Sequence, residues 1–365
     1  AQAAWARTSS RPSAVMIGAD SPEESAAALG PLAGAASGRL RWAVNSAEWQ
    51  PEGEGAGREF RFLVSLIPEA AEREQVTRFI FFKDQKRALL SRLLCRRASA
   101  AVLGLSSFAG LHIARTKGRK PFLKDPRPPE HRADLDNFNF NVSHEGDWVV
   151  LASEPICVCG IDVAAPQDRR GGGKRIDLFE DFGDQLTEEE WRLVQEEAAV
   201  RRPDVSSDET PGYEAFQRLW SCKEAFVKAR GDGLGFRLQR AGFSFQQLEP
   251  DTGLGPAFLA AVRLDGQPVA DWRFFQHRLG SSHWVTVARG PTSDVVDQVG
   301  ALRQTLRRDT QSFSREAWQA ELDRESPRFD EVPVGFLVPE DNMPGYVAAG
   351  GLPWRGVAAS AQPRT

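Results

Sequence analysis

Two parts of this chain repeat the same helix and strand patterns, and this repetition constrains the fold more than any other feature. Residues 86–90 (KRALL) resemble residues 223–227 (KEAFV), and residues 147–152 (DWVVLA) resemble residues 282–287 (SHWVTV). Two α+β halves of similar build, related by a pseudo-twofold axis, would explain both pairs. Helix and strand periods also produce such matches by chance. The repeat therefore favours a fold of two subdomains without establishing it.

The 365 residues are enough for two average domains, and their patterning divides them into four segments. Residues 1–37 are rich in Ala, Ser, Gly and Pro, which predicts a disordered leader. Residues 38–152 and 153–290 are the two predicted subdomains. Residues 291–365 are polar with scattered hydrophobics, and they predict a partly ordered extension that covers the core and carries no chemistry.

The longest predicted helix spans residues 84–103 and ends at Gly104. One face is apolar and the other is basic, and we expect most of the basic side chains to face solvent. These basic residues are Lys83, Lys86, Arg87, Arg92, Arg96 and Arg97.

Alternating or short apolar runs predict strands in both halves. They lie at residues 138–142, 148–152, 159–163, 272–277 and 284–288.

Two further helices carry clear boundary signals. Thr187 and Glu190 predict a capping box at the start of one. The other is predicted to have Thr210 as its cap, Pro211 in its first turn and Gly231 at its end.

Composition excludes several classes of function. With 46 Lys and Arg against 50 Asp and Glu, the net charge of −4 argues against a general nucleic-acid binder. No apolar run approaches the roughly 20 residues that span a bilayer, so we expect no membrane partner. No secretory signal opens the chain, so the four cysteines predict thiols in a reducing compartment. We expect a cytoplasmic protein, although the leader is also compatible with an organelle.

Candidate catalytic residues lie in three short segments. Glu224 and Lys228 stand four residues apart on a predicted helix, so they project from one face. A surface ion pair worth about 0.3–0.5 kcal/mol is the simplest account of their spacing. Asp162, however, ends a short apolar strand, and Ser143 and His144 lie in a predicted turn between strands. Two carboxylates with open geometry suit Mg²⁺, which prefers oxygen ligands.

Taken in order, three motifs resemble those of the Sfp-type 4′-phosphopantetheinyl transferases: residues 141–144 (NVSH), 160–163 (GIDV) and 220–228 (WSCKEAFVK). Within that family the chain resembles the long eukaryotic branch, the aminoadipate-semialdehyde dehydrogenase phosphopantetheinyl transferases. The resemblance covers about residues 40–290. It implies an α+β fold in which two similar α/β subdomains are related by a pseudo-twofold axis.

The resemblance also implies roles for individual residues. Asp162 and Glu224 would hold Mg²⁺. Bacterial members often carry a further acid where this chain has Ala164, and Glu145 is the candidate third ligand here, with a solvated turn residue as the alternative. Glu224 is the candidate general base, and Lys228 would neutralise the pyrophosphate. The residues implied in coenzyme A binding are Arg115, Lys117, Arg119, Lys120, Asn141, Ser143, His144, Lys223 and Lys228.

The implied reaction moves phosphopantetheine from coenzyme A to a serine of an apo acyl carrier protein or carrier domain. The enzyme would then be a holo-[acyl-carrier-protein] synthase that serves fatty acid biosynthesis or related pathways. A non-catalytic module that binds coenzyme A or a carrier protein is the alternative. The presence of Asp162, Glu224 and Lys228 favours the enzyme. We expect a monomer, because two halves in one chain would already build the site between them.

Overall fold

The computed structural model describes residues 30–165, 178–200, 211–248 and 256–354. The predicted cap Thr210 and the first 29 residues of the predicted leader lie outside this part. The described chain begins within the predicted leader, with the short helix η1 (Gly30–Leu32), and the Pro31 carbonyl accepts a hydrogen bond from the Trp42 indole (2.9 Å).

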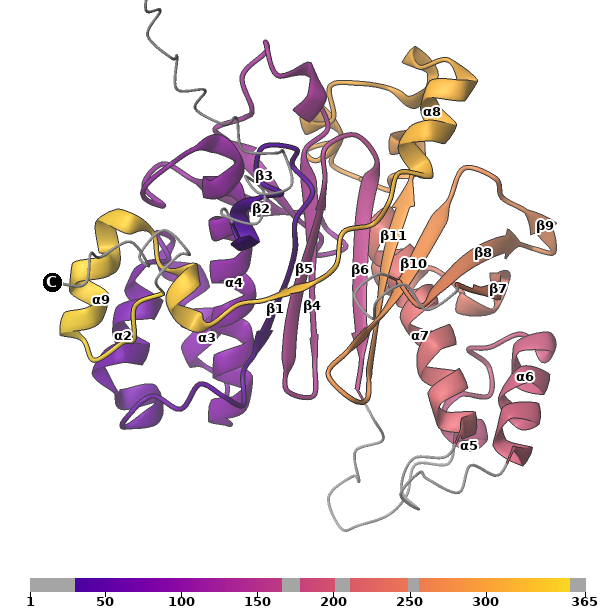
Figure 1. The fold of residues 1–365 in the computed structure, drawn as a ribbon, viewed down its shortest axis with the longest axis horizontal. Helices are drawn as coiled ribbons and strands as arrows, with labels where there is room; N and C mark the ends of the chain where they lie inside the picture. The colour runs from indigo at the N-terminus through magenta and orange to yellow at the C-terminus, as the bar shows by residue number, and fades with distance from the viewer. Residues whose placement is uncertain (1–29, 166–177, 201–210, 249–255, 355–365) are drawn as a thin grey trace, which may run out of the picture.

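Two mixed layers of helix and sheet lie side by side (Figure 1), which confirms the predicted α+β class. The first sheet has the order β12-β1-β5-β4, with β1 parallel to β12 and the other pairs antiparallel. Its strands are β1 (Arg41–Asn45), β4 (Asn139–Glu145), β5 (Trp148–Glu154) and β12 (Asp330–Glu331).

The second sheet is antiparallel and has the order β6-β11-β10-β8-β7, with β9 paired to β8. A separate hairpin joins β2 (His112–Arg115) to β3 (Pro121–Asp125). The strands of the second sheet are β6 (Val158–Ala164), β7 (Ala241–Gln247), β8 (Phe258–Leu264), β9 (Gln267–Pro268), β10 (Arg273–Leu279) and β11 (His283–Gly290).

One long helix packs against each sheet: α4 (Phe82–Leu103) contacts β4 and β5, and α7 (Pro211–Arg230) contacts β6 and β11. The repeated sequence segments lie on α4 and β5 in one half and on α7 and β11 in the other, so they occupy corresponding elements. The other α-helices in the described part of the chain are α2 (Arg58–Ser65), α3 (Ala70–Thr77), α5 (Leu178–Phe182), α6 (Glu188–Ala199), α8 (Arg315–Leu322) and α9 (Met343–Ala348).

The predicted helix ends and the capping box are found in the structure, although α4 begins at Phe82 and not at residue 84 as predicted. Gly104 ends α4 with φ 67° and Gly231 follows α7 with φ 84°, both in the left-handed region that glycine adopts without strain. At the start of α6, the Thr187 hydroxyl accepts from the Glu190 amide, and the Glu190 carboxylate accepts from the Thr187 amide. This is the predicted capping box.

The prediction of a solvated basic face on α4 is wrong for four of its six cations, because Lys86, Arg92, Arg96 and Arg97 are buried. Neighbouring segments supply their acceptors. Lys86 donates to the carbonyls of Ser46 (2.7 Å) and Trp49 (3.0 Å). Backbone and carboxylate oxygens thus replace the water that these cations would otherwise require.

The C-terminal extension is part of both halves of the core. It runs from α8, beside the second sheet, across to α9, beside α2 (Figure 1). Between them it adds strand β12 to the first sheet and packs Phe336 edge-on against Trp42, with ring centroids 4.8 Å apart. The extension therefore contributes to the fold more than the expected partial cover.

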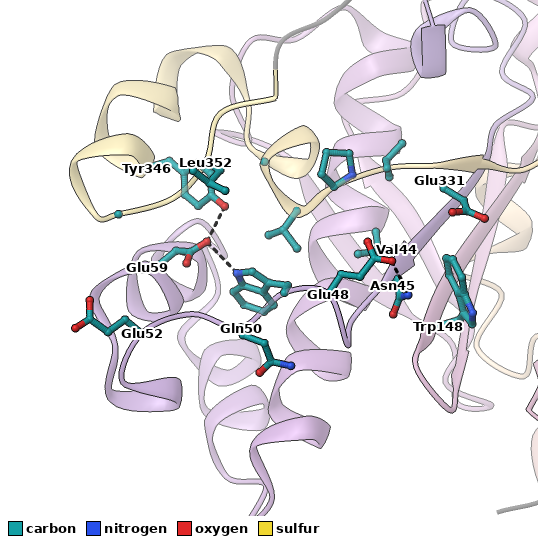
Figure 2. A pocket seen from close by; sticks show the side chains of 16 residues that line it. Val44, Asn45, Glu48, Gln50, Glu52, Glu59, Trp148, Glu331, Tyr346 and Leu352 are labelled. Carbon is teal, nitrogen blue, oxygen red and sulfur yellow. Dashed lines mark hydrogen bonds between the residues drawn. The ribbon is translucent and has the colours of Figure 1, made fainter. Parts of the chain in front are cut away.

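A cavity of about 730 Å³ lies where the extension meets the first subdomain (Figure 2). Glu59 on α2 bridges the two segments there. Its carboxylate accepts hydrogen bonds from the Tyr346 hydroxyl (2.7 Å) and the Trp49 indole (2.9 Å).

Replacing Tyr346 with Phe is expected to lower the free energy of unfolding by about 1–2 kcal/mol. The ring remains, but the carboxylate loses one of its two donors. Chemical denaturation measures the change, with the exposed Val347→Ala as the control. A loss equal to that of the control would show that the bridge does not stabilise the extension.

His277 on β10 is buried beside a cluster of guanidinium groups, and it makes stability depend on pH. Burial, with the charges of Arg41 and Arg289, lowers its pKa from 6.5 to about 3. Between about pH 6.5 and 3, His277 binds a proton in the unfolded chain but not in the folded chain. The free energy of unfolding therefore falls as pH drops from 6.5 towards 3. We expect a slope of about 1 kcal/mol per pH unit from this residue, and His277→Gln should flatten the dependence between pH 6.5 and 5.

Candidate active site

Three side chains from three elements meet between the two sheets. Lys228 of α7 places its Nζ 2.9 Å from the Ser143 hydroxyl of β4 and 2.5 Å from Asp162 Oδ1 of β6. Ser143 in turn donates to the same Asp162 oxygen (3.0 Å). The structure thus brings together three of the residues singled out in the sequence.

Polar side chains hold β4 against β6, although the two strands belong to different sheets. Asn139 Oδ1 accepts from the amide of Cys159 (2.8 Å), and Asn141 Oδ1 accepts from the amide of Ile161 (3.0 Å). Because side chains alternate along a strand, residues 139, 141 and 143 share the face of β4 towards β6. This side-chain ladder fixes the position of Asp162 relative to Ser143.

Asn139→Leu is expected to destabilise the protein by about 1–3 kcal/mol. The change leaves the buried Cys159 amide without an acceptor, and it removes the Asn139 donor from the carbonyls of Asn137 (2.8 Å) and Cys157 (2.8 Å). Urea unfolding tests the prediction. An unchanged midpoint would mean that the ladder adds nothing to the joint between the sheets.

Two glycines allow the backbones around the site to approach closely. A Cβ on Gly160 would lie 2.1 Å from the Ala225 carbonyl oxygen, so glycine permits β6 to pack directly on α7. A Cβ on Gly118 would lie 2.2 Å from the Gly231 carbonyl oxygen, so glycine permits the β2–β3 loop to reach the end of α7. These two close approaches bring the charged side chains of β6, α7 and the β2–β3 loop near one another.

Carboxyl groups from three elements surround Lys228. Burial raises the pKa of Asp162, and partial loss of solvent together with the charge of Asp162 raises the pKa of the half-buried Glu224 and of Glu145, which is exposed at the end of β4. Burial also acts against the Lys228 ammonium, but the charge of Asp162 and of the two glutamates outweighs it and raises the pKa of Lys228. The site therefore keeps a lysine cation among carboxylates that repel one another.

His144 lies at the rim of this cluster. The residue is exposed at the end of β4, but partial loss of water around its ring, followed by the charges of Lys228 and Arg87, lowers its pKa to about 4. The imidazole is consequently neutral at physiological pH, and it can donate a hydrogen bond or accept one but adds no charge.

The carboxylates have the donor chemistry of a divalent-cation site, because oxygen ligands from three elements converge and repel one another. Within the described residues, however, no group of three or more His, Cys, Asp or Glu side chains is arranged to hold a metal. Asp162 Oδ1 instead accepts from Lys228 and Ser143. Glu145 accepts from the Ala165 amide (2.9 Å). The three carboxylates thus have the chemistry to bind a divalent cation, but in this structure the cation that Asp162 contacts is the Lys228 ammonium.

The loop between β2 and β3 brings further cations to the site. Arg115 and Arg119 line the adjoining cavity, and Lys117 is exposed on the same loop outside the lining. Lys120 is buried, and its ammonium donates to the carbonyls of Cys159 and Lys228, which ties the loop to β6 and α7. Burial lowers the pKa of Lys120 to about 8.

This cavity, of about 800 Å³, lies against the lysine and carboxylate cluster. Arg115, Arg119, Lys120 and Lys228 give it a basic side, whereas Phe182, Trp220, Leu234 and Phe236 give it an apolar side. Glu224 also lines it, beside the cations. A ligand that carries phosphates at one end and an uncharged chain at the other would match both sides.

Comparison with known proteins identifies the family. The family model described as 4′-phosphopantetheinyl transferase, N-terminal, matches residues 47–156, and that of the 4′-phosphopantetheinyl transferase superfamily matches residues 158–288. The mouse (Mus musculus) L-aminoadipate-semialdehyde dehydrogenase-phosphopantetheinyl transferase is 33% identical over 250 residues, which cover 68% of this chain and 74% of the relative. The chain belongs to the 4′-phosphopantetheinyl transferase family.

Relatives from other lineages agree. A phosphopantetheinyl transferase of Thraustochytrium sp. is 32% identical over 247 residues, covering 68% of this chain and 77% of the relative. The 4′-phosphopantetheinyl transferase of Bacillus subtilis is 32% identical over 185 residues, covering 50% of this chain and 68% of the relative. Transferases of this family take coenzyme A as substrate, typically with a divalent metal, and act on carrier proteins.

Charge distinguishes the two cavities described above as sites for this substrate. The cavity at the C-terminal extension is lined by four glutamates, and its described lining contains no Lys, Arg or His (Figure 2). Coenzyme A carries several phosphate charges, which those carboxylates would repel. The basic cavity beside Lys228 therefore matches this substrate better than the cavity at the extension does.

The structure does not bring Lys223 into this cavity. Its side chain is fully buried, its ammonium donates to the carbonyls of Leu238 (3.0 Å) and Ala241, and it pairs with Glu190 (2.8 Å). Lys223 thus joins α7 to α6 and to the start of β7, which is a structural role. Asn141 lines the cavity, but its amide oxygen is engaged with β6.

Sequence reasoning missed the part played by Asn139 and by the apolar side of the cavity. The alternation of Asn139, Asn141 and Ser143 on a strand with Phe138 and Phe140 was the available signal, because it places three polar side chains on one face. Phe182 and Trp220 gave no such signal, since aromatic residues on helices usually belong to the core.

In the described residues, no helix is both long enough and apolar enough to cross a bilayer.

Proposed function

We propose that this transferase moves 4′-phosphopantetheine from coenzyme A to the serine of an apo acyl carrier protein or carrier domain, and so acts as a holo-[acyl-carrier-protein] synthase. The observation that carries the proposal is Lys228, held by Ser143 and Asp162 beside Glu224 at a basic cavity. A simple surface ion pair would need neither the buried Asp162 nor the further hydrogen bond to Ser143.

In the proposed reaction, the serine oxygen bonds to the β-phosphorus of coenzyme A, and the bond from that phosphorus to the 3′,5′-ADP oxygen breaks. Phosphoryl transfer needs positioning and neutralisation of charge more than covalent help from the protein. Lys228 supplies a fixed cation for the pyrophosphate, and Arg115 and Arg119 supply cations for the nucleotide end. The 3′,5′-ADP then leaves as an anion.

The proton of the attacking serine goes to Glu224, directly or through a water molecule. Burial and the Asp162 charge raise the pKa of Glu224, which makes its carboxylate a stronger base than an exposed glutamate. The neutral His144 at the rim can orient a phosphate oxygen by donating a hydrogen bond.

Asp162, Glu224 and Glu145 would hold Mg²⁺ if Lys228 turned from Asp162 towards the substrate phosphates. The bound ion would supply further neutralisation of the pyrophosphate charge. Support for this placement is the charge of Asp162, which raises the pKa of both Glu145 and Glu224 and which a divalent cation would offset. A monomer in the cytoplasm and a role in fatty acid biosynthesis stay predictions.

The function is tested by incubating the protein with coenzyme A, Mg²⁺ and apo carriers of the acyl and peptidyl types. Intact-mass spectrometry should show a gain of one phosphopantetheine on the carrier, and chromatography should show an equal amount of 3′,5′-ADP. No gain with any carrier, while coenzyme A still binds, would favour the binding-module alternative. A gain only on peptidyl carriers would contradict the acyl-carrier assignment.

A further inference from the structure

Three consecutive large apolar residues before α4 are not used by the fold. The Phe82 ring packs against Phe60, with centroids 5.3 Å apart. In contrast, Phe79, Ile80 and Phe81 expose 41%, 91% and 64% of their surfaces. Single exposed apolar residues are ordinary on proteins, but contiguous ones mark an interaction site. We refer to residues 79–81 as the apolar loop.

The structure holds the apolar loop in place. The Gln85 side chain of α4 donates to the carbonyls of Phe79 (2.7 Å) and Thr77 (3.4 Å). Phe81 is the N-cap of α4 in an extended conformation, and its carbonyl accepts from the amides of Asp84 (3.0 Å) and Gln85 (3.2 Å). The exposed side chains therefore project from an ordered turn.

The apolar loop leads into the start of α4, which lies near the β4–β5 hairpin and His144. The first turns of α4 contact the β4–β5 hairpin, because Arg87 donates to the Gly146 carbonyl. The charges of Arg87 and Asp84 also act on His144, which neighbours Ser143. A carrier serine must reach the phosphate in the cavity, so the carrier has to dock on a surface adjoining it. Leu234, at the cavity, is fully exposed as well, but it is a single side chain.

The charge around the apolar loop favours an acidic partner. Arg78 and Lys83 flank it on either side, and both are exposed. Residues 78–83 (RFIFFK) contain no acidic residue. Carrier proteins are usually acidic, so a helix of the carrier with apolar and acidic side chains would complement this surface in shape and in charge.

We propose that residues 78–83 are the surface on which the carrier protein docks for transfer. This inference rests on the proposed transferase function and adds the element that recognises the protein substrate. The apolar loop supplies the buried contact, and Arg78 and Lys83 supply the attraction to the acidic partner. Apolar contacts at the centre of an interface contribute most of the affinity, whereas charges at its edge act more on the rate of association.

The test compares the wild type with the double variant Ile80→Ser/Phe81→Ser and with Val347→Ser, an exposed apolar position on α9. We expect the KM for an apo acyl carrier protein to rise about tenfold or more in the double variant. The kcat at saturating carrier and the KM for coenzyme A should stay within about twofold of wild type. Val347→Ser should behave as wild type. Arg78→Glu/Lys83→Glu should also raise the carrier KM, more at low salt than at high salt.

Binding is measured separately by calorimetry with a carrier whose acceptor serine is replaced by alanine. This assay tests docking even if the wild type transfers nothing, so failure of the function and failure of the docking surface are distinguishable. An unchanged carrier KM and an unchanged Kd in the double variant would overturn the proposal. The proposal would also be overturned, in favour of a membrane contact, if the double variant lost binding to phosphatidylserine vesicles that the wild type shows while its affinity for the carrier stayed intact.

Discussion

Replacing Lys228 with Met should lower the kcat of phosphopantetheine transfer about a hundred- to a thousandfold. Lys228 is the cation that Asp162 and Ser143 hold beside the cavity, at 2.5 Å and 2.9 Å. In the proposed reaction its charge stabilises the negative charge that grows on the pyrophosphate, and a fixed charge of this kind is a large contribution to catalysis. Methionine keeps the length of the side chain but removes the charge. Initial rates at saturating coenzyme A and carrier measure the effect.

Lys117→Met is the matched control, because Lys117 is an exposed lysine on the basic loop that does not line the cavity. We expect this control to keep kcat within about threefold of wild type and to raise the KM for coenzyme A slightly at most. Similar kcat values for Lys228→Met and Lys117→Met would show that the pair with Asp162 is only structural.

Glu154→Gln should lower the free energy of unfolding by about 3–5 kcal/mol. Glu154 is fully buried and pairs with Arg39 (3.1 Å), Arg41 and Arg289 (2.7 Å). Burial opposes its charge, but the three guanidinium groups outweigh that effect and lower its pKa to about 2. Glutamine fills the same volume and leaves these cations without their shared anion, which is the costly way to break a buried pair.

The contribution of Glu154 to the free energy of unfolding also depends on pH. Because its pKa is depressed from 4.5 to about 2, its contribution to stability is complete above about pH 4.5 and is lost as pH falls towards 2. The Glu154→Gln variant should therefore lose part of the wild-type sensitivity to acid in that window. Glu331→Gln, at an exposed position, should change stability by no more than about 0.5 kcal/mol. Equal unfolding midpoints for the two variants would contradict the account of the cluster.

Local pattern was enough to predict much of the fold. The capping box of Thr187 and Glu190 and the left-handed Gly104 and Gly231 are decided by neighbouring residues, and their positions were predicted correctly. Five strands, β4, β5, β6, β10 and β11, were predicted from alternating or short apolar runs, although β4 extends through Ser143 to Glu145, where a turn was expected. These features depend on contacts within a few residues, which a single sequence records.

The features that could not be predicted from the sequence depend on long-range packing. Lys223 and Lys228 both follow from the same motif, yet one is buried against Glu190 and the other faces Asp162. Only the packing of α7 between α6 and β6 separates the two faces. The bridge from Tyr346 to Glu59 joins residues 287 positions apart, and no local pattern announces it. The spacing of Glu224 and Lys228 did predict a shared face, because helical geometry alone fixes it.

The central claim is that phosphopantetheine transfer takes place where Asp162, Lys228 and Glu224 meet. The most direct test is intact-mass spectrometry of an apo acyl carrier protein after incubation with coenzyme A, Mg²⁺ and either wild type or Asp162→Ala. Circular dichroism of both proteins would establish that the variant is folded. The account predicts a mass gain of one phosphopantetheine with wild type, and none with the folded variant or with wild type in EDTA. A full mass gain with folded Asp162→Ala would place the chemistry elsewhere.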